Sequence, residues 1–417
     1  MSPRRVIGAM TGTSLDAIDV ALVRIAGQRL ALRCDVERVG SRPLGELGPR
    51  LRAFCEGARL SAAEICALSR EFALAHCAAI GELLASAGAG CDLIGIHGQT
   101  VFHAPPLSWQ LFSPAPVAAE FGCKVICDFR AADIAAGGQG APLTPIADYV
   151  LLGSDHESRV VVNLGGFANH TVLPRRHAAA VNLSDLVRAA EHSGVSPVTS
   201  APIAALMGRR GWGDEHAHPP AAGGAELDAI RGGDICACNH LLDGLARRLL
   251  NAPFDRDGAA AERGVARAEI VAQIRGGLEQ QAAQRRSLGS GDELRMVIDE
   301  VAPAAAANDV LRSAGAALAD TIAAAVARDA PDVGRVLLAG GGAANRTLRG
   351  ELVRAIGACG LRAAVEMTDA HGLPAGHREA IAFAVLADLC DQGVPIALPR
   401  ITGARRAVVA GSVCAAP

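Results

Sequence analysis

Two apolar runs around a short polar turn open this sequence and constrain its fold more than any other feature. The stretch Val6–Val23 reads as a β-hairpin with the turn Thr11–Ser14 at its tip, followed directly by two carboxylates. Such a tip offers backbone N–H groups, hydroxyls and a carboxylate, which suit the phosphates of a nucleotide and their Mg²⁺. A plain surface turn is the alternative. The residues predicted to bind phosphate here are Gly12, Thr13, Ser14, Leu15, Asp16 and Asp19.

The same pattern of strand, glycine turn and strand returns later in the chain. Arg159–Asn163 is an apolar strand, and the turn Leu164–Asn169 leads into a second strand, which indicates an internally duplicated fold. A third glycine run, Gly340–Gly342, follows the apolar strand Arg335–Ala339 and precedes a helix. Glycines at such a junction let the backbone lie close to a ligand.

Three glycine turns in this order resemble the layout of actin-like ATPases and sugar kinases. The resemblance implies an α/β fold of two actin-like (ribonuclease H-like) domains with a central interdomain cleft. It also implies that the first two turns hold the phosphates of ATP and that the third supports adenosine. The later residues assigned to ATP in this way are Asn163, Gly165, Gly166, Gly340, Gly341 and Gly342.

The basic residues restrict how the chain could bind ATP. Of 40 lysines and arginines only Lys124 is a lysine, and no Gly-Lys-Ser/Thr triplet exists, which excludes a P-loop. Lys124 also lacks the glycine-rich framework of a protein-kinase site. We therefore expect ATP to be bound by backbone amides, hydroxyls, Mg²⁺ and arginine.

The bulk composition indicates a folded cytoplasmic protein. The chain has 417 residues, of which half are apolar and 20% are charged, enough for two or three domains. A net charge of −3 gives no general affinity for nucleic acid or a membrane surface. We find no signal peptide and no apolar run near the ~18 residues that cross a membrane. The 12 cysteines are scattered, as in a reducing compartment, and the one cluster at 236–240 lacks the second pair of a structural zinc site.

The order of the patterns predicts the domain boundaries. We expect an N-terminal actin-like domain over residues 1–150 and a C-terminal one over residues 151–417. Residues near 175–230 are poorly periodic and read as an atypical insertion or lid. A C-terminal segment could pack back on the first domain.

Polar residues follow two apolar strands of the predicted first domain. His97–Thr100 comes after the run Leu93–Ile96, and Asp128–Arg130 comes after Val125–Cys127. In open α/β sheets ligands bind at the carboxyl ends of the strands. The candidate substrate contacts at this edge are His97, Gln99, Thr100 and Arg130. The planar guanidinium of Arg130 suits a phosphate or a carboxylate; an ion pair with Asp128 or Asp133 is the alternative.

Eight short motifs, in order, resemble the anhydro-N-acetylmuramic acid kinase family. They are Ile7–Asp16, His97–Thr100, Asp128–Arg130, Ala136–Pro142, Asn163–Asn169, Gly340–Gly342, Glu379–Phe383 and Thr402–Ala404. The resemblance implies an ATP-dependent carbohydrate kinase that opens the 1,6-anhydro ring of its sugar with water and phosphorylates O6 in peptidoglycan recycling. It implies ATP and Mg²⁺, with Asp16 as the candidate metal ligand, and a possible homodimer. Glu379 opens a helix and could be merely a favourable charge there.

The general base of the family lies in a Gly-Phe-Asp-Thr-Gly-Pro-Gly-Asn segment, whose best match is Gly232–Asn239. The resemblance thus implies Asp234 as the catalytic base and Asn239 as a substrate contact. Residues 235–238 are Ile-Cys-Ala-Cys, which puts Cβ atoms and thiols where the backbone is expected to approach the ligand. Three readings stay open: the family substrate, another anhydrosugar, or a nucleotide-binding paralogue with weak turnover.

Overall fold

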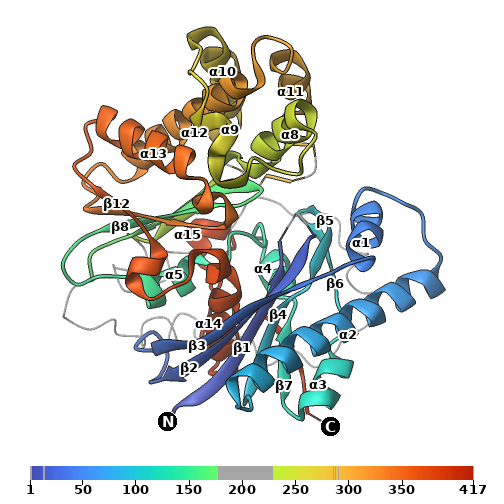
Figure 1. Ribbon diagram of the computed structural model, residues 1–417. Helices are drawn as coiled ribbons and strands as arrows, with labels where there is room; N and C mark the ends of the chain where they lie inside the picture. The colour runs from blue at the N-terminus through green and yellow to red at the C-terminus, as the bar shows by residue number, and fades with distance from the viewer. Residues whose placement is uncertain are drawn as a thin grey trace, which may run out of the picture.

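The computed structural model describes residues 2–12, 15–176, 229–284, 286, 288–289 and 291–416 (Figure 1). Two sheets, each flanked by helices, lie one above the other in Figure 1. Thr13 and Ser14, which we predict to bind phosphate, lie outside the described residues. So do residues 177–228 of the predicted insertion.

The first sheet has six strands in the order β13-β7-β4-β1-β2-β3. Their bounds are β1 (Arg4–Thr11), β2 (Ala17–Ala26), β3 (Arg33–Pro43), β4 (Leu93–His97), β7 (Lys124–Cys127) and β13 (Ser412–Cys414). β2 runs antiparallel to both β1 and β3, whereas β1, β4 and β7 are parallel. The chain end thus returns to this sheet, because β13 pairs antiparallel with β7.

The second sheet repeats this arrangement with five strands in the order β10-β9-β8-β11-β12. Their bounds are β8 (Arg159–Leu164), β9 (Phe167–Leu173), β10 (Arg231–Ala237), β11 (Arg335–Ala339) and β12 (Ala364–Met367). β9 is antiparallel to β8 and β10, and β8, β11 and β12 are parallel, as for β1, β4 and β7. The shared order and directions confirm the duplication and the predicted α/β, actin-like fold class. The predicted boundary near residue 150 stays a prediction.

Helix α14 (Arg378–Asp391) packs against the first sheet at very short range. A Cβ added at Gly8 of β1 would lie 1.9 Å from the carbonyl oxygen of Ala380, and one at Gly95 of β4 would lie 2.6 Å from that of Phe383. Only glycine leaves room for the helix at these two positions, so the sequence of both strands determines how closely α14 approaches. This contact carries the start of α14 to the carboxyl ends of β1 and β4.

The other face of the first sheet is covered by α1 (Leu47–Cys55), α2 (Ala62–Ala87) and α3 (Ala115–Phe121) (Figure 1). A capping box formed by Ser61 and Glu64 begins α2, and Gly88 ends it in the left-handed conformation at φ 60°. The first half also contains a separate hairpin, β5 (Gln99–Ala104) and β6 (Leu107–Leu111), and the short helix α4 (Ala131–Ala135). The short helices α5 (Pro145–Leu152) and α15 (Pro399–Thr402) contact the second sheet, at β9 and β10, and pack into the apolar cluster that contains α14.

The helices of the second half gather over one face of the second sheet, at the top of Figure 1. They are α8 (Asn239–Leu250), α9 (Ala259–Glu262), α10 (Ala268–Gln284), α11 (Arg295–Val301), α12 (Ala307–Asp329) and α13 (Arg346–Ala358). Short 3₁₀ turns are η2 (Arg256–Gly258), η3 (Gly341–Ala344), η4 (Thr368–His371) and η5 (Ala375–His377). Within the described ranges α12 alone has the length and composition to cross a membrane, but 78% of its apolar window is buried, as in a core helix.

Candidate active site

The tip of the first hairpin lies beside the start of β5. The hydroxyl of Thr11, at the end of β1, donates a buried hydrogen bond of 2.8 Å to Oε1 of Gln99. The turn closes through the N–H of Leu15, which donates to the carbonyl of Gly12 at 3.1 Å. Asp16 is 74% exposed, with Nη2 of Arg52 3.4 Å from its carboxylate. The predicted phosphate turn and the predicted sugar contact Gln99 are therefore neighbours.

Asp19 has polar partners on other elements. Its Oδ1 accepts a 2.5 Å hydrogen bond from the hydroxyl of Ser41 on β3, and that hydroxyl also lies 3.1 Å from Nε2 of His377. Burial raises the pKa of Asp19, and the hydrogen bond from Ser41 opposes this rise. Asp19 thus ties the first hairpin to the start of α14.

Arg130 and His97 form a buried pair at the carboxyl ends of β7 and β4. Nη2 of Arg130 lies 3.2 Å from Nε2 of His97, and Nη1 donates to the carbonyl of Gly140 at 2.6 Å. Because a guanidinium can only donate, Nε2 of His97 is the acceptor and the ring is neutral. Burial and the charge of Arg130 accordingly hold the pKa of His97 well below its usual value. The ring stacks on Phe383 of α14 with 4.6 Å between centroids.

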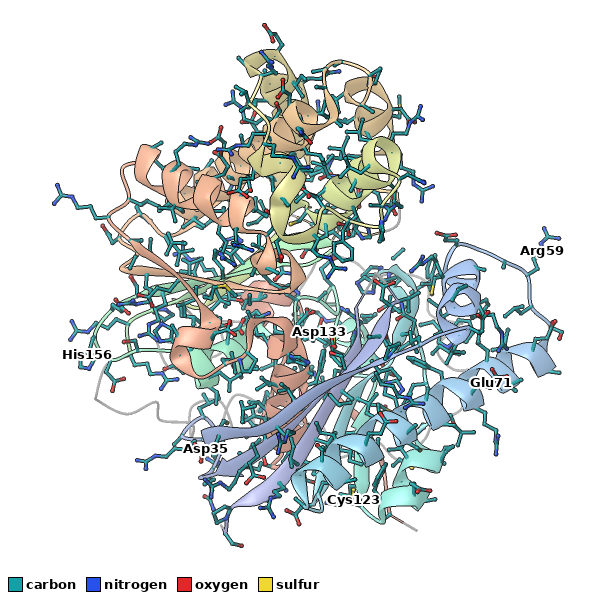
Figure 2. The ribbon with its side chains drawn as sticks, viewed as in Figure 1. Asp35, Arg59, Glu71, Cys123, Asp133 and His156 are labelled. Carbon is teal, nitrogen blue, oxygen red and sulfur yellow. The ribbon has the colours of Figure 1, made fainter. Side chains whose placement is uncertain are left out.

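The alternative ion pair of Arg130 with a neighbouring aspartate does not form. In the described part of the chain no carboxylate oxygen lies within 4.0 Å of the Arg130 guanidinium. Asp133, labelled in Figure 2, instead accepts hydrogen bonds from the N–H of Gly140 at 2.6 Å and the hydroxyl of Thr402 at 2.7 Å. Nε of Arg130 is buried without a hydrogen-bond partner. A buried guanidinium in this state is suited to receive an anionic ligand.

Asp234 reaches toward Arg130 from the second sheet. It lies on β10 opposite Asn169, and its Oδ2 accepts a 2.8 Å hydrogen bond from the N–H of Leu288. Burial raises the pKa of Asp234, while the N–H of Leu288 and the positive charge of Arg130 oppose the rise. The structure therefore brings the predicted base of the second half within electrostatic range of the predicted anion contact of the first.

The altered residues after Asp234 lie away from this meeting point. Ile235, Cys236, Ala237 and Cys238 are all at most 1% exposed and belong to the apolar core over the second sheet. The expectation that their Cβ atoms and thiols occupy the ligand surface is therefore wrong. β10 has a register shift between Asp234 and Cys236, and the segment after Asp234 packs in the core, where apolar side chains and thiols are favoured.

The second and third glycine turns are in direct contact. A Cβ at Gly340, whose φ is 83°, would lie 2.6 Å from Oδ1 of Asn163, and a Cβ at Gly342 would lie 2.8 Å from Oδ1 of Asn239. The N–H of Asn239 donates to the carbonyl of Gly165 at 3.0 Å. These contacts gather the ends of β8, β10 and β11 into one glycine-lined surface, as expected for a site where backbone approaches a ligand.

Two carboxylates that received no firm role in the sequence analysis join this region. Glu379, at the start of α14, lies 3.5 Å from Nδ2 of Asn163, and burial raises its pKa. Asp243 of α8 lies within electrostatic range of Asp16, and burial raises the pKa of Asp243 to about 6. The negative charge of Asp16 adds to this rise in the pKa of Asp243.

Among the described residues no three potential metal-ligating side chains cluster. Mg²⁺ in nucleotide sites needs only one or two carboxylates, because water and phosphate oxygens complete its shell. The exposed carboxylate of Asp16 fits that requirement.

Thr100 lies on β5, with its hydroxyl donating to Oε1 of Gln110 on β6 at 2.9 Å. It therefore extends the polar edge that begins at His97 and Gln99.

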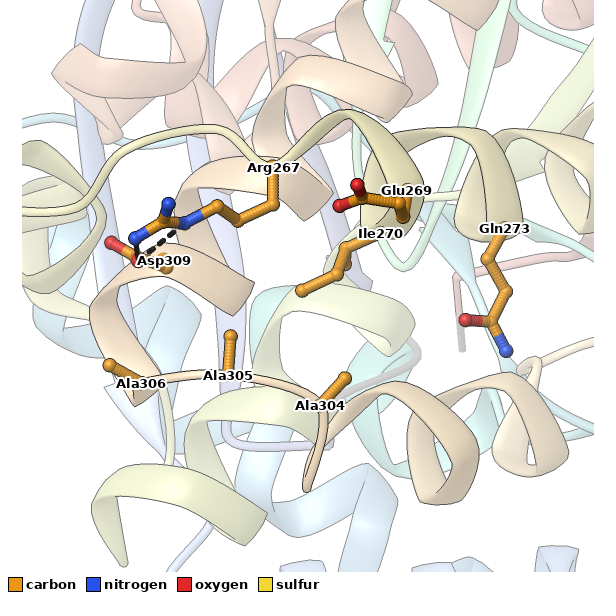
Figure 3. Close-up of a pocket in the computed structure, with 8 residues that line it drawn as sticks. All are labelled: Arg267, Glu269, Ile270, Gln273, Ala304, Ala305, Ala306 and Asp309. Carbon is orange, nitrogen blue, oxygen red and sulfur yellow. Dashed lines mark hydrogen bonds and ion pairs between the residues drawn. The ribbon is translucent and has the colours of Figure 1, made fainter.

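A cavity of about 490 Å³ lies elsewhere, between α10 and the turn that leads into α12 (Figure 3). The Arg267–Asp309 ion pair stands at one end of it, and Ala304–Ala306 forms its floor in this view. None of the predicted site residues lines it, so it is not the site assembled above.

Comparison with known proteins shows similarity to one family over nearly the whole chain. A family model described as anhydro-N-acetylmuramic acid kinase matches residues 4–182 and 227–416. The chain is 30% identical to the protein of that name from Salinibacter ruber, covering 99% of this chain and 96% of the relative. It is 34% identical to the one from Picosynechococcus, covering 98% and 99%. A solved structure, (R)-2-hydroxyglutaryl-CoA dehydratase component A from Acidaminococcus fermentans, is 12% identical with a TM-score of 0.43, covering 92% and 98%.

Proposed function

The chain belongs to the anhydro-N-acetylmuramic acid kinase family, and from that membership we propose the reaction that it catalyses. It hydrolytically opens 1,6-anhydro-N-acetylmuramic acid and transfers the γ-phosphoryl group of ATP to O6. The products are N-acetylmuramic acid 6-phosphate and ADP. The reaction belongs to the recycling of the cell wall, and the enzyme is cytoplasmic; all 12 cysteines are free thiols, in keeping with a reducing compartment. A homodimer is proposed by family resemblance alone.

The observation that carries this proposal is the approach of Asp234 to Arg130. A general base that activates water must be a carboxylate held near the reacting carbon. Asp234 has one oxygen engaged by the N–H of Leu288, and its other oxygen, Oδ1, accepts no hydrogen bond from a described residue. Burial raises the pKa of Asp234, and the positive charge of Arg130 opposes this rise and so favours the ionised form that can take a proton.

The proposed reaction consumes only the anhydro sugar, water and ATP. Asp234 takes a proton from water as the water oxygen bonds to the anomeric carbon, and the bond from that carbon to O6 breaks. O6 bonds to the γ-phosphorus of ATP, and ADP leaves. The family implies Mg²⁺, which would neutralise charge on the phosphates; Asp16 would hold it, with Asp243 as the second carboxylate on the opposite side.

The nucleotide contacts follow from the three glycine turns. The first turn, Gly12–Asp16 with Asp19 behind it, and the second, Gly165–Gly166, would take the phosphates through backbone N–H groups. Asn163 braces the third turn, Gly340–Gly342, which would support adenosine. The close approach of Gly340 to Asn163 supports this assignment, because a side chain there would collide with the second turn.

The sugar contacts follow from the polar edge of the first sheet. Arg130 would pair with the lactyl carboxylate of the substrate, because its Nε is buried and unpartnered. Neutral His97, Gln99, Thr100 and Asn239 offer both donors and acceptors to sugar hydroxyl and amide groups. The thiols of Cys236 and Cys238 are buried and so do not line these sugar contacts.

The test is release of ADP by the purified protein with three acceptors: 1,6-anhydro-N-acetylmuramic acid, levoglucosan, and no sugar. We expect ADP release and a 6-phosphorylated product with the first acceptor alone. Release with levoglucosan at a comparable rate would contradict the substrate assignment. Measurable ATP binding without ADP release under any condition would refute the proposal that the protein is a kinase.

A further inference from the structure

Two thiols lie in contact at the edge of the first sheet farthest from the site. Sγ of Cys91 and Sγ of Cys123 are 3.9 Å apart, although the residues are 32 positions apart in the chain. Cys91 precedes β4 and Cys123 precedes β7, and these strands are parallel neighbours with Leu93 opposite Lys124. Cys123, labelled in Figure 2, lies at the lower edge of the first half, whereas His97 and Arg130 follow the opposite ends of the same strands.

The backbone on both sides of the pair is well defined. Helix α2 ends at Gly88 and α3 ends at Gly122, both in the left-handed conformation, with φ of 60° and 62°. Each cap turns the chain from a helix into a strand within a few residues. The two sulfurs are thus held side by side by neighbouring strands and not by a chance approach of long loops.

The other cysteines differ from this pair. Among the described residues, Cys91 and Cys123 are the one pair of thiols in hydrogen-bonding contact. Cys66 and Cys359 are exposed and single, and Cys236 and Cys238 are buried in the core of the second half. Cys91 is partly exposed, so a small oxidant can reach one sulfur of the pair.

We infer that Cys91 and Cys123 are a site of reversible oxidative modification, at which a low-molecular-weight disulfide such as oxidised glutathione generates an intramolecular disulfide. The Cys91 sulfur attacks the reagent, and one glutathione thiolate leaves. The Cys123 thiolate then attacks Sγ of Cys91, and the second glutathione thiolate leaves. Two protein thiols are oxidised, one glutathione disulfide is reduced to two thiols, and the two protons pass to solvent.

The contact between the two sulfurs also biases the ionisation of the reduced thiols. The contact with Cys91 lowers the pKa of Cys123, although burial and the nearby charge of Asp92 oppose this. The same contact raises the pKa of Cys91. Before oxidation Cys123 is therefore the better thiolate of the pair, whereas Cys91 is the more exposed sulfur, so access and not ionisation makes Cys91 the first to attack.

The cross-link acts on stability and not on catalysis. It joins β4 to β7 at their amino ends and closes a loop that contains α3 and the β5–β6 hairpin. Loop closure restricts the unfolded chain, so the oxidised protein should melt at a higher temperature, by on the order of 5 °C. The carboxyl ends that carry His97 and Arg130 are unchanged, so the kinase activity should persist within about twofold.

To test this inference, the native full-length protein is treated with oxidised glutathione and the reagent is removed. Free thiols are then alkylated, and the peptides are mapped by mass spectrometry. We expect a linked 91–123 peptide pair, about 2 Da lighter than the reduced pair, which dithiothreitol reverses. Cys91→Ser and Cys123→Ser should each abolish the link, and Cys66→Ser, which removes an exposed single thiol, should leave it intact.

The inference is overturned if Cys66 and Cys359 become glutathionylated while residues 91 and 123 stay reduced or carry separate glutathiones. Because the wild-type peptide map needs no variant, a misfolded serine variant would not obscure the result. An inactive protein that still forms the link would contradict the proposed function alone, so the two failures are distinguishable.

Discussion

Replacing Asp234 with asparagine separates its role as a base from its role in the fold. The two side chains have nearly the same size, and the amide oxygen can still accept the 2.8 Å hydrogen bond from the N–H of Leu288. The variant also removes a charge that burial disfavours, since burial raises the pKa of Asp234. We therefore expect a folded protein with an unchanged or slightly higher melting temperature and no proton acceptor.

The expected loss of activity follows from the step that is removed. General base catalysis contributes about 10²–10⁴-fold, which corresponds to roughly 3–5 kcal/mol of the activation barrier. Asp234→Asn changes no backbone N–H group and none of the residues assigned to ATP, so the Kd for ATP should change by less than about twofold. We expect a fall of about 10³-fold in kcat.

The pH profile gives a second, independent readout. Because burial raises the pKa of Asp234, the carboxyl is protonated at pH values where an ordinary aspartate is already ionised. The activity of the wild type should therefore fall with decreasing pH through a pKa above the usual 3.8, since only the ionised form accepts a proton. In the Asp234→Asn variant this acidic limb should be absent.

The assay is ADP release with saturating ATP and varied 1,6-anhydro-N-acetylmuramic acid, with ATP binding measured by calorimetry. Asp292 is a matched control, because it is a nearby carboxylate already paired with Arg286 at 2.6 Å; Asp292→Asn should lower kcat less than about fivefold. A loss below tenfold in Asp234→Asn, or an unchanged acidic limb, would refute the assignment of the base.

Three further substitutions test the packing and the anion contact. Arg378→Ala should destabilise the protein by about 3–5 kcal/mol in urea unfolding, because it leaves the Asp148 carboxylate buried and unpaired; the two side chains are 1% and 0% exposed. Gly8→Ala should cost about 1–3 kcal/mol or prevent folding, since its Cβ would collide with the carbonyl of Ala380. Arg130→Lys should lower kcat/KM for the carboxylate-bearing sugar by about 10–100-fold without altering ATP affinity, because a single ammonium replaces the planar fork.

Matched controls exist for each of these. Arg50→Ala breaks an exposed ion pair with Glu71 and should cost less than about 1 kcal/mol. Gly81→Ala fills open space in α2 and should stabilise by up to about 1 kcal/mol. For Arg130→Lys the unchanged ATP affinity is the control. An equal loss of unfolding free energy in a packing variant and its control would contradict the packing argument. An equal loss of affinity for the sugar and for ATP in Arg130→Lys would contradict the assignment of Arg130 as the anion contact.

The local elements of the site could be predicted because their signals lie within a few residues of one another. An apolar run, a glycine turn and a second apolar run are enough to specify the β1–β2 and β8–β9 hairpins, and both form. The glycines at 340–342 predict a close approach of the backbone to a ligand, which stays a prediction; the structure shows that Gly340 also packs closely on Asn163, where a Cβ would collide. The family could likewise be predicted from the sequence, because the resemblance depends only on the order of short motifs.

Long-range contacts could not be predicted in the same way. His97 and Arg130 are 33 positions apart, and their pairing depends on the parallel register of β4 with β7. The motif resemblance pointed to Asp234, but its partner Leu288 lies 54 positions away in another loop. No local sequence pattern shows that Arg130 contacts His97 and forms no ion pair with Asp133, because both residues lie near Arg130 in the folded chain.

By itself the sequence determined the class of this protein: two repeated α/β halves, three glycine turns, and a chemistry without a phosphate-binding lysine. Those properties follow from residue types and short spacings. Only the tertiary structure decided which side chains meet between the halves and which way the altered segment after Asp234 turns. The thiols of Cys236 and Cys238 lie in the core of the second half, and the direction of a side chain depends on packing that no local pattern records.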